Sequence, residues 1–214
     1  MVKDKVVLDP YAFKSAKKRD KTIYLVYKLG ESLEYFKRLS EKTGMHFDIT
    51  LLRSGTLSGR ASGELICTYG HKHEENRGEL YFVLKNECMI ELYDETSRET
   101  LVLSLPERSY IFIHPKFFHR LIAGKEDCVV LGIVPKDAGH DYSVVKNKGF
   151  PFHVFYDSKR GMLKYVHNPN FSGVSLLIDK VLSKSSLTAI LKRINTFRKL
   201  LFNPKTGRSI YYLG

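Results

Sequence analysis

The chain has 214 residues, which is enough for one good-sized domain with an appendage. Its 43% hydrophobic and 27% charged residues are close to the average of globular proteins and exclude a disordered, collagen-like or disulfide-scaffold protein. The longest apolar run, 128–134, is far shorter than the roughly 20 residues of a membrane span, and residues 1–9 contain no apolar segment of signal-peptide length, so we expect a cytoplasmic protein without membrane attachment. The net charge of +12 is unevenly distributed, because eight basic residues and one acidic residue follow Phe171.

Short runs rich in Val, Ile, Leu, Phe and Tyr alternate with Gly, Asn, Pro and charged clusters between residues 22 and 166. The runs recur roughly every 8 to 12 residues without long helices between them, which predicts antiparallel β structure in a barrel or jelly roll. The expected strands are 22–28, 46–53, 64–69, 80–84, 89–93, 100–103, 109–114, 120–123 and 127–134, followed by a hairpin of 152–156 and 162–166 with its turn at 158–161.

Two segments depart from the strand pattern. Residues 31–43 place Leu33, Phe36 and Leu39 on one face and end at Gly44, which predicts one amphipathic helix between two strands. Ser186 is the expected N-cap of a second helix, whose apolar face would consist of Leu187, Ile190, Leu191, Ile194, Phe197 and Leu201. We therefore divide the chain into a barrel domain, 1–170, and a basic C-terminal extension, 171–214, which is helical and could end in a hairpin.

Histidines and one carboxylate give the strongest chemical signal. His71 and His73 are two positions apart, so on a strand their side chains point to the same side. If Glu79 begins the neighbouring strand and His119 lies at the end of another, three imidazole nitrogens and one carboxylate can meet at the barrel mouth. This donor set suits Fe(II), Mn, Ni or Zn, and an ordinary edge strand is the alternative interpretation of the histidine pair. No comparable partners accompany the histidines that we take as structural or surface residues, namely His46, His114, His153 and His167.

Three sequence pieces between residues 63 and 171 occur in a characteristic order. They are Thr68-Tyr-Gly-His-Lys-His73 with Glu79-Leu-Tyr81, then Pro115-Lys-Phe-Phe-His-Arg120, then Asp137-Ala-Gly-His-Asp-Tyr142 followed by Lys148-Gly-Phe150. With these pieces, and a weaker match at Phe47-Asp-Ile-Thr50 and Tyr24-Leu-Val-Tyr27, the chain resembles the cupin-type phosphoglucose isomerases known chiefly from archaea. The resemblance implies an all-β cupin barrel that forms a homodimer, binds one divalent metal and interconverts glucose 6-phosphate and fructose 6-phosphate in glycolysis and gluconeogenesis.

The resemblance also implies roles for individual residues. The metal ligands would be His71, His73, Glu79 and His119, with Fe expected first and Zn, Mn or Ni as alternatives. The phosphate of the substrate would be bound by Thr50, Thr68 and Gly70, with Tyr24 near the same pocket. The sugar itself would be lined by Tyr81, His140 and Tyr142. Hydroxyl groups and a glycine amide are suitable donors for a phosphate, although each of these residues taken alone also fits an ordinary strand or loop.

Several positions depart from the family's usual pattern. Val134 stands where the family usually has a tyrosine, which removes one hydroxyl from the pocket, and Ser54 stands where it has a proline. The turn after Leu84 also differs. The helix at 31–43 and the tail after Phe171 are additions to the typical member. None of the substitutions falls on an expected metal ligand, but together they allow a different substrate preference.

The expected reaction moves hydrogen between C1 and C2 of a sugar. It needs an electrophile for the substrate oxygens, which the metal would supply, and a group that takes and returns a proton. Glu79 and His140 are the candidates for that group, and both a proton transfer through an enediol and a hydride shift remain open. The rival hypothesis is a non-catalytic cupin that senses a sugar phosphate and binds nucleic acid through its tail. Because a winged helix needs three helices and the tail offers at most two, we favour a tail helix that packs on the barrel or on a partner subunit.

Overall fold

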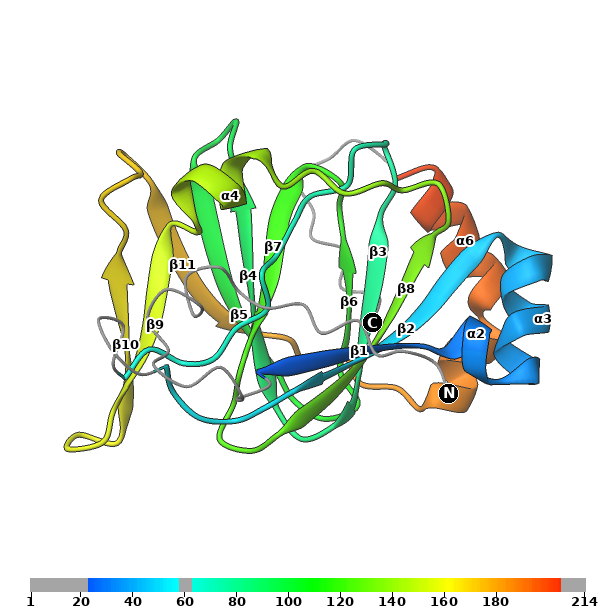
Figure 1. Ribbon diagram of the computed structural model, residues 1–214, viewed down its shortest axis with the longest axis horizontal. Coiled ribbons are helices and arrows are strands. Elements are labelled where there is room, and N and C mark those ends of the chain that lie inside the picture. Colours follow the sequence, from blue (N-terminus) through cyan, green and yellow to red (C-terminus); the bar gives the residue numbers. More distant parts are fainter. Residues whose placement is uncertain (1–22, 58–62, 205–214) are drawn as a thin grey trace.

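The computed structural model describes residues 23–57 and 63–204, which form two facing β-sheets with a hairpin at one end and helices at the other (Figure 1). The strands are β1 (Tyr24–Lys28), β2 (Met45–Leu52), β3 (Glu79–Lys85), β4 (Cys88–Asp94), β5 (Glu99–Leu105), β6 (Tyr110–Ile113), β7 (Phe117–Ile122), β8 (Cys128–Pro135), β9 (Phe152–Asp157), β10 (Met162–His167) and β11 (Ser175–Lys180). The helices are α2 (Leu29–Ser32), α3 (Glu34–Thr43), α4 (Ser143–Lys148), α5 (Leu187–Lys192) and α6 (Ile194–Phe202). No helix in these described ranges is long and apolar enough to cross a membrane.

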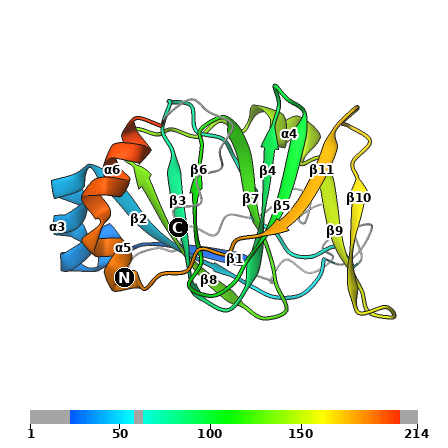
Figure 2. The same cartoon turned by 180° about the vertical axis from the view of Figure 1, so that it is seen from behind.

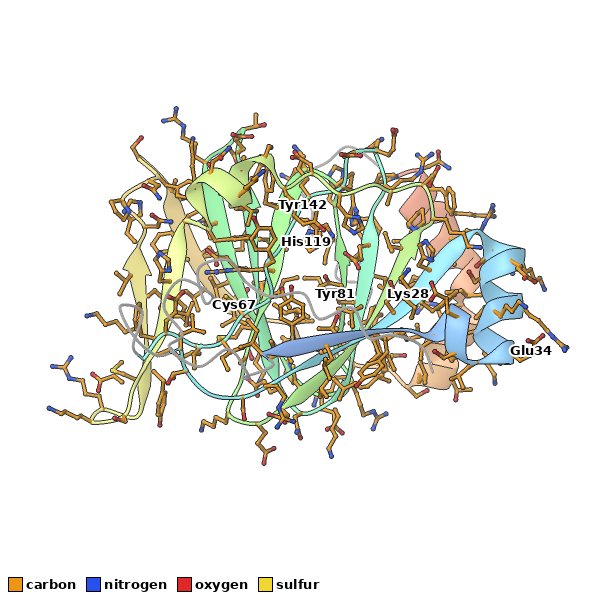
Figure 3. All side chains as sticks on the ribbon, in the orientation of Figure 1. Lys28, Glu34, Cys67, Tyr81, His119 and Tyr142 are labelled. Carbon is orange, nitrogen blue, oxygen red and sulfur yellow. The ribbon has the colours of Figure 1, made fainter. Side chains whose placement is uncertain are left out.

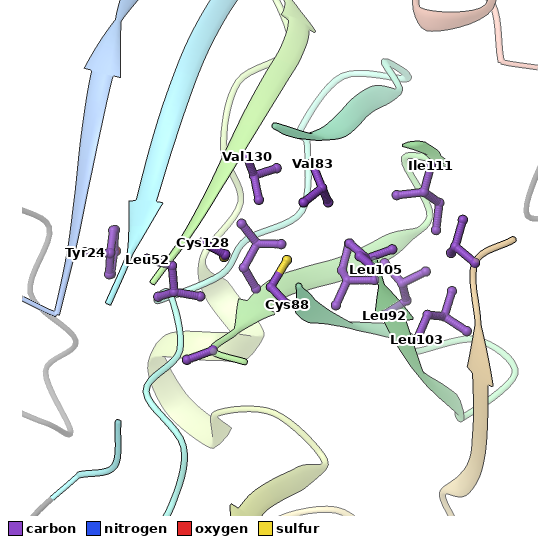
Figure 4. Close-up of a cluster of buried hydrophobic side chains, with 14 of the residues drawn as sticks. Tyr24, Leu52, Val83, Cys88, Leu92, Leu103, Leu105, Ile111, Cys128 and Val130 are labelled. Atoms are coloured by element: carbon purple, nitrogen blue, oxygen red, sulfur yellow. The ribbon is translucent and has the colours of Figure 1, made fainter. Parts of the chain in front are cut away.

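The two main sheets confirm the predicted mostly-β cupin fold. One has the strand order β1-β2-β8-β3-β6 and the other the order β11-β5-β4-β7, while β9 and β10 form a separate two-stranded sheet. Within the described residues, hydrogen bonds do not join the two sheets into a closed barrel, so the predicted jelly roll is an open one. The apolar side chains between the sheets form the central core, drawn in Figure 4, to which β2, β4, β5 and β8 all contribute.

The N-terminal helical segment is divided in two. Leu33, expected within a single helix over 31–43, has extended backbone angles (φ −126°, ψ 121°) and separates α2 from α3. Its side chain is 50% exposed, so burial does not hold it in a helix. Phe36 and Leu39 pack against the outer face of the five-stranded sheet, and α3 ends at Gly44 in the left-handed conformation predicted for its C-cap.

Two other segments differ from the expected elements. Residues 64–69 form isolated bridges instead of a strand, because successive parts of this segment bond to different neighbours. The Leu65 N–H donates to the Val154 carbonyl, whereas the Thr68 N–H donates to the Leu121 carbonyl. In the tail, the unexpected strand β11 adds to the four-stranded sheet in parallel with β5 (Figure 2). The short helix α4 was not expected either.

The tail helices pack on the molecule itself. The Ser186 side chain accepts a hydrogen bond from the Ala189 N–H at 3.2 Å, as predicted for an N-cap. Arg193 separates α5 from α6, so the expected single helix is two short ones. Ile194, Phe197 and Leu201 are buried in the cluster that covers the outer face of the five-stranded sheet. The expected terminal hairpin falls mainly on 205–214, outside the described residues.

Candidate metal centre

A short turn at residues 70–73 brings two histidines to the open end of the sheets. The His71 N–H donates to the His119 carbonyl at 3.1 Å, and the His119 N–H donates back to His71 at 2.8 Å. Lys72 and Asp141 exchange a second pair of backbone hydrogen bonds, at 3.0 and 2.7 Å. These two bridges hold the turn between β7 and the loop before α4, so segments about 50 and 70 residues apart in the sequence meet here.

The turn depends on Gly70. Its φ is +79°, a conformation that residues with a side chain rarely adopt. A Cβ placed there would lie 2.5 Å from the Phe150 ring and 2.8 Å from the His119 carbonyl oxygen. The backbone before His71 can therefore approach β7 closely only because residue 70 has no side chain.

Four of the residues predicted from the sequence come together. One donor atom from each of His71, His73, Glu79 and His119 lies within 4.8 Å of the other three, and Figure 3 places His119 above Tyr81 in this region. The Glu79 Oε2 atom is 2.9 Å from His119 Nε2, 3.3 Å from His73 Nε2 and 3.9 Å from His71 Nε2. His73 and His119 are only 2% and 1% exposed.

Backbone carbonyls fix the orientation of two of these rings. His73 Nδ1 lies 3.1 Å from the Gly139 carbonyl, and His119 Nδ1 lies 3.3 Å from the Phe117 carbonyl. Because a carbonyl only accepts, each Nδ1 donates its proton, and in a neutral ring Nε2 then carries a lone pair. Both lone pairs point at a carboxylate oxygen, an arrangement that requires either a proton on each ring or a shared cation.

The third histidine distinguishes between these possibilities. The Nε2 atom of His71 is buried and has no hydrogen-bond partner among the described residues. Burial first, and then the neighbouring His119, lower the pKa of His71 well below its usual value, so its ring is neutral. A buried, neutral nitrogen directed at a carboxylate suits coordination of a metal ion. Three imidazoles and one carboxylate thus fit a divalent transition metal.

Glu79 is the anionic centre of the group. Burial alone would raise its pKa, but the hydrogen bonds with His119 and His73 outweigh burial and hold the pKa well below its usual range. The carboxylate is therefore ionised across the physiological pH range. For His73, burial is the largest single cause and lowers the pKa, but the hydrogen bond with Glu79, the Glu79 charge and the Gly139 carbonyl together raise it, so the net shift is upward. The Glu79 carboxylate among the histidine rings therefore stabilises a cation at this site, either a proton on a ring or a metal ion.

His140 and Tyr142, expected to line the sugar, lie next to the cluster. The His140 ring is 4.4 Å from the His71 ring between centroids, and it stacks on Tyr142 at 5.9 Å with an interplanar angle of 13°. Tyr142 is 41% exposed and also contacts Tyr69 at 5.6 Å. The loop that carries them is anchored by the Lys72–Asp141 bridge, and Figure 3 shows Tyr142 above His119 in that view.

The residues expected to hold the phosphate have hydrogen-bond donors or lie on strands near the cluster. The Thr68 Oγ1 atom accepts the Leu121 N–H at 3.0 Å, so its own proton remains to donate. The Tyr24 hydroxyl accepts the Tyr69 N–H at 3.3 Å. Thr50 lies opposite Val26 and Val130 on the sheet. No hydrogen bond of the Gly70 N–H is found in the part of the chain that the structure describes.

Tyr81 and Asp48 complete the inner surface near Glu79. Burial, and then the negative charge of Glu79, raise the pKa of Tyr81 well above its usual value. Asp48 was not among the predicted site residues. Burial, and then Glu79, raise its pKa to about 6. Alternation along the strand was a signal that could have found it, because Asp48 shares a face with Thr50.

Residues 3–171 match the family model for glucose-6-phosphate isomerase. The glucose-6-phosphate isomerases of Thermococcus gammatolerans and Pyrococcus furiosus are each 30% identical over 168 residues, which is 77% of this chain and 81% of theirs. Among solved structures, oxalate decarboxylase from Bacillus subtilis matches with a TM-score of 0.37 and 12% identity, over 51% of this chain and 24% of that one. The chain therefore belongs to the glucose-6-phosphate isomerase family, in its archaeal, cupin-type branch.

Proposed function

We propose that the protein is a metal-dependent aldose–ketose isomerase that interconverts glucose 6-phosphate and fructose 6-phosphate. The observation that supports this most strongly is the gathering of His71, His73, Glu79 and His119 within 4.8 Å in a chain of this family. A divalent metal held by these four residues would polarise the carbonyl and hydroxyl oxygens of the substrate. Fe is our first choice for the metal, and Zn, Mn and Ni have compatible donor preferences.

The chain's own residues would divide the remaining work. Glu79 is ionised and His140 lies beside His71, so either can hold a proton near C1 and C2. Tyr142, stacked on His140, would orient that ring and border the sugar. Tyr81 contacts the His119 ring at 5.8 Å and would cover the opposite side of the sugar. A proton transfer through an enediol and a hydride shift would both use Glu79 and His140 beside C1 and C2.

Neutral donors would bind the phosphate. The Thr68 hydroxyl and the Gly70 N–H are available to donate hydrogen bonds to an anion, and Thr50 and Tyr24 lie on the paired strands β2 and β1. Thr68→Val should therefore weaken hexose phosphate binding about tenfold or more, since a hydrogen bond to a charged group contributes about 1.5 to 3 kcal/mol. Thr100→Val is a matched control, because Thr100 is a buried threonine on β5 whose hydroxyl has no partner in the described part of the chain. Equal losses in both variants would contradict the phosphate assignment.

The direct test of the activity is a coupled assay that converts fructose 6-phosphate to glucose 6-phosphate and detects the product with a dehydrogenase. We expect activity with metal, loss on chelation and recovery when metal is added back. Free fructose should react far more slowly, because it lacks the phosphate. An enzyme that acts equally well on free fructose, or shows no isomerase activity with any of the four metals, would refute the proposal.

The rival hypothesis of a nucleic-acid-binding sensor is not favoured. The apolar face of the tail helices is buried against the five-stranded sheet, and the family match is to an isomerase. A homodimer and a cytoplasmic location remain proposals that follow from the family. Light scattering on the purified protein tests the first, and a monomer at assay concentration would contradict it.

A further inference from the structure

We propose that Asp48 binds the substrate directly, accepting hydrogen bonds from hydroxyl groups in the middle of the sugar. This inference rests on the proposed function and adds a residue that determines which sugar phosphate is accepted. Asp48 is not one of the four metal-binding residues, and its carboxylate would bind the hydroxyl groups of the sugar chain.

The position of Asp48 on β2 directs its side chain inward. Its neighbour Phe47 is buried in the cluster beneath the helices, on the outer face of the sheet. Leu52, four residues further, belongs to the central core between the sheets. Since side chains alternate along a strand, Asp48 shares the inner face with Thr50 and Leu52. Asp48 is therefore on the face that carries the metal-binding group.

The strand beside Asp48 has a glycine at the level of Glu79, so the Glu79 and Tyr81 side chains lie directly over its backbone. Asp48 pairs with Gly132 on β8, and Gly132 pairs on its other side with Tyr81 on β3. A Cβ at Gly132 would lie 3.0 Å from Glu79 Oε1 and 3.4 Å from Tyr81 Cε1. The surface above Gly132 is thus bordered by Glu79 and Tyr81 on one side and by Asp48 on the other. A sugar bound at Glu79 would extend across this glycine toward Asp48.

The chemistry of Asp48 suits hydroxyl groups. No hydrogen bond or ion pair of its carboxylate is found within residues 23–57 and 63–204, and its cross-strand partner Lys28 pairs instead with Glu31 at 2.9 Å. An ionised carboxylate only accepts hydrogen bonds, so it matches sugar hydroxyls and repels a phosphate. Thr50 lies two residues along the same face, about 7 Å away at the usual rise of a strand. A six-carbon chain spans that distance, with its phosphate at Thr50 and its hydroxyls at Asp48.

The test measures binding rather than turnover. Sorbitol 6-phosphate, an open-chain polyol phosphate that cannot isomerise, is titrated calorimetrically into the metal-loaded wild type, Asp48→Ala and Asp48→Asn, with inorganic phosphate as a second ligand. We expect Asp48→Ala to weaken sorbitol 6-phosphate about tenfold or more. Asp48→Asn should lose less, because its amide oxygen still accepts. Affinity for inorganic phosphate should not fall in either Asp48 variant, because Asp48 makes no favourable contact with the phosphate. Asp179→Ala, which removes an exposed aspartate on β11, is the control.

Three outcomes would overturn the inference in distinguishable ways. Equal affinity of wild type and Asp48→Ala for sorbitol 6-phosphate would show that Asp48 does not contact the sugar. An equal loss for sorbitol 6-phosphate and inorganic phosphate would show that the substitution disturbs the site as a whole. Failure of the wild type to bind either ligand would refute the proposed function itself, and the inference with it.

Discussion

Gly70→Ala is a substitution whose effect on the metal centre can be worked out from the structure. Two costs arise. The left-handed φ of +79° costs a residue with a Cβ about 1 to 2 kcal/mol. The new methyl group would also overlap the Phe150 ring at 2.5 Å and the His119 carbonyl oxygen at 2.8 Å. Phe150 is 1% exposed and cannot turn into solvent, so relieving the overlap adds about 1 to 3 kcal/mol, the usual cost of overpacking.

The same overlap should act on the metal ligands. The His119 carbonyl that the methyl group would strike is the one that accepts the His71 N–H at 3.1 Å. Moving this carbonyl separates the segment that carries His71 from β7, which carries His119. Disturbing the groups that orient metal ligands typically lowers metal affinity about 10- to 100-fold. We therefore expect Gly70→Ala to lower the free energy of unfolding by about 2 to 5 kcal/mol and metal affinity by at least about tenfold.

Gly161→Ala separates the two costs. Gly161 has a similar φ of +66°, but nothing lies within 4 Å of the position its Cβ would take. It should lose only the backbone contribution, about 1 to 2 kcal/mol, and bind metal as the wild type does. Urea unfolding gives the free energies, and competition with a fluorescent chelator gives the metal affinities. Equal stability losses in the two variants, with metal affinity unchanged in Gly70→Ala, would refute this reasoning.

Three further predictions concern the tail, a hydrogen-bonded aspartate at the surface and the histidines. Phe197→Ala should lower the free energy of unfolding in urea by about 3 to 5 kcal/mol, because the ring is 1% exposed against the sheet. Lys199→Ala, at an exposed position of the same helix, should change it by less than about 0.5 kcal/mol. Similar small effects of both substitutions would mean that the tail does not pack as described. The hydrogen bond from the Ser54 N–H lowers the pKa of Asp127, so Asp127→Asn should lower the free energy of unfolding by up to about 1 kcal/mol at pH 7, a figure discounted for the exposure of the side chain. That loss of stability should disappear as the pH falls through the lowered pKa, whereas Glu126→Gln should show no such pH dependence. A loss that persists in acid would contradict the prediction. Metal affinity should decrease as the pH falls through the raised pKa of His73, because protons then compete with the metal for the ring. A chelator competition titration that shows constant affinity from pH 8 to 5 would count against histidine ligands.

Local sequence patterns were sufficient for the parts of the fold that depend on nearby residues. Gly44 ends α3 as its conformational freedom predicts, and Ser186 caps α5 through its own side chain. Strand alternation predicted the closeness of His71 and His73, although in the structure they lie in a segment with isolated bridges and on no named strand. Their meeting with Glu79 and His119 needed the resemblance as well, because separations of 6 and 40 residues do not by themselves define a site. Their role as metal ligands remains a prediction.

Other features depend on contacts that no local pattern encodes. β11 is a strand because it pairs in parallel with β5, some 75 residues earlier, while most of its residues are exposed and show no alternation of burial. Leu33 interrupts the first helix although its spacing suits one. Strand alternation places Asp48 on the same face as Thr50, but its pairing with Gly132 is not visible in a single strand's sequence. The periodicity of a single segment does not show which distant strand it pairs with, so these features could not be predicted from it.

The central claim is that His71, His73, Glu79 and His119 hold one metal ion on which isomerase activity depends. Metal content by mass spectrometry, measured together with fructose 6-phosphate isomerisation on the same samples of wild type and His73→Ala, tests it most directly. The His73 ring is buried, so circular dichroism should confirm that the variant is folded. We predict about one metal per chain and activity in the wild type, with both lost in His73→Ala. Undiminished metal content and activity in the folded variant would contradict the account.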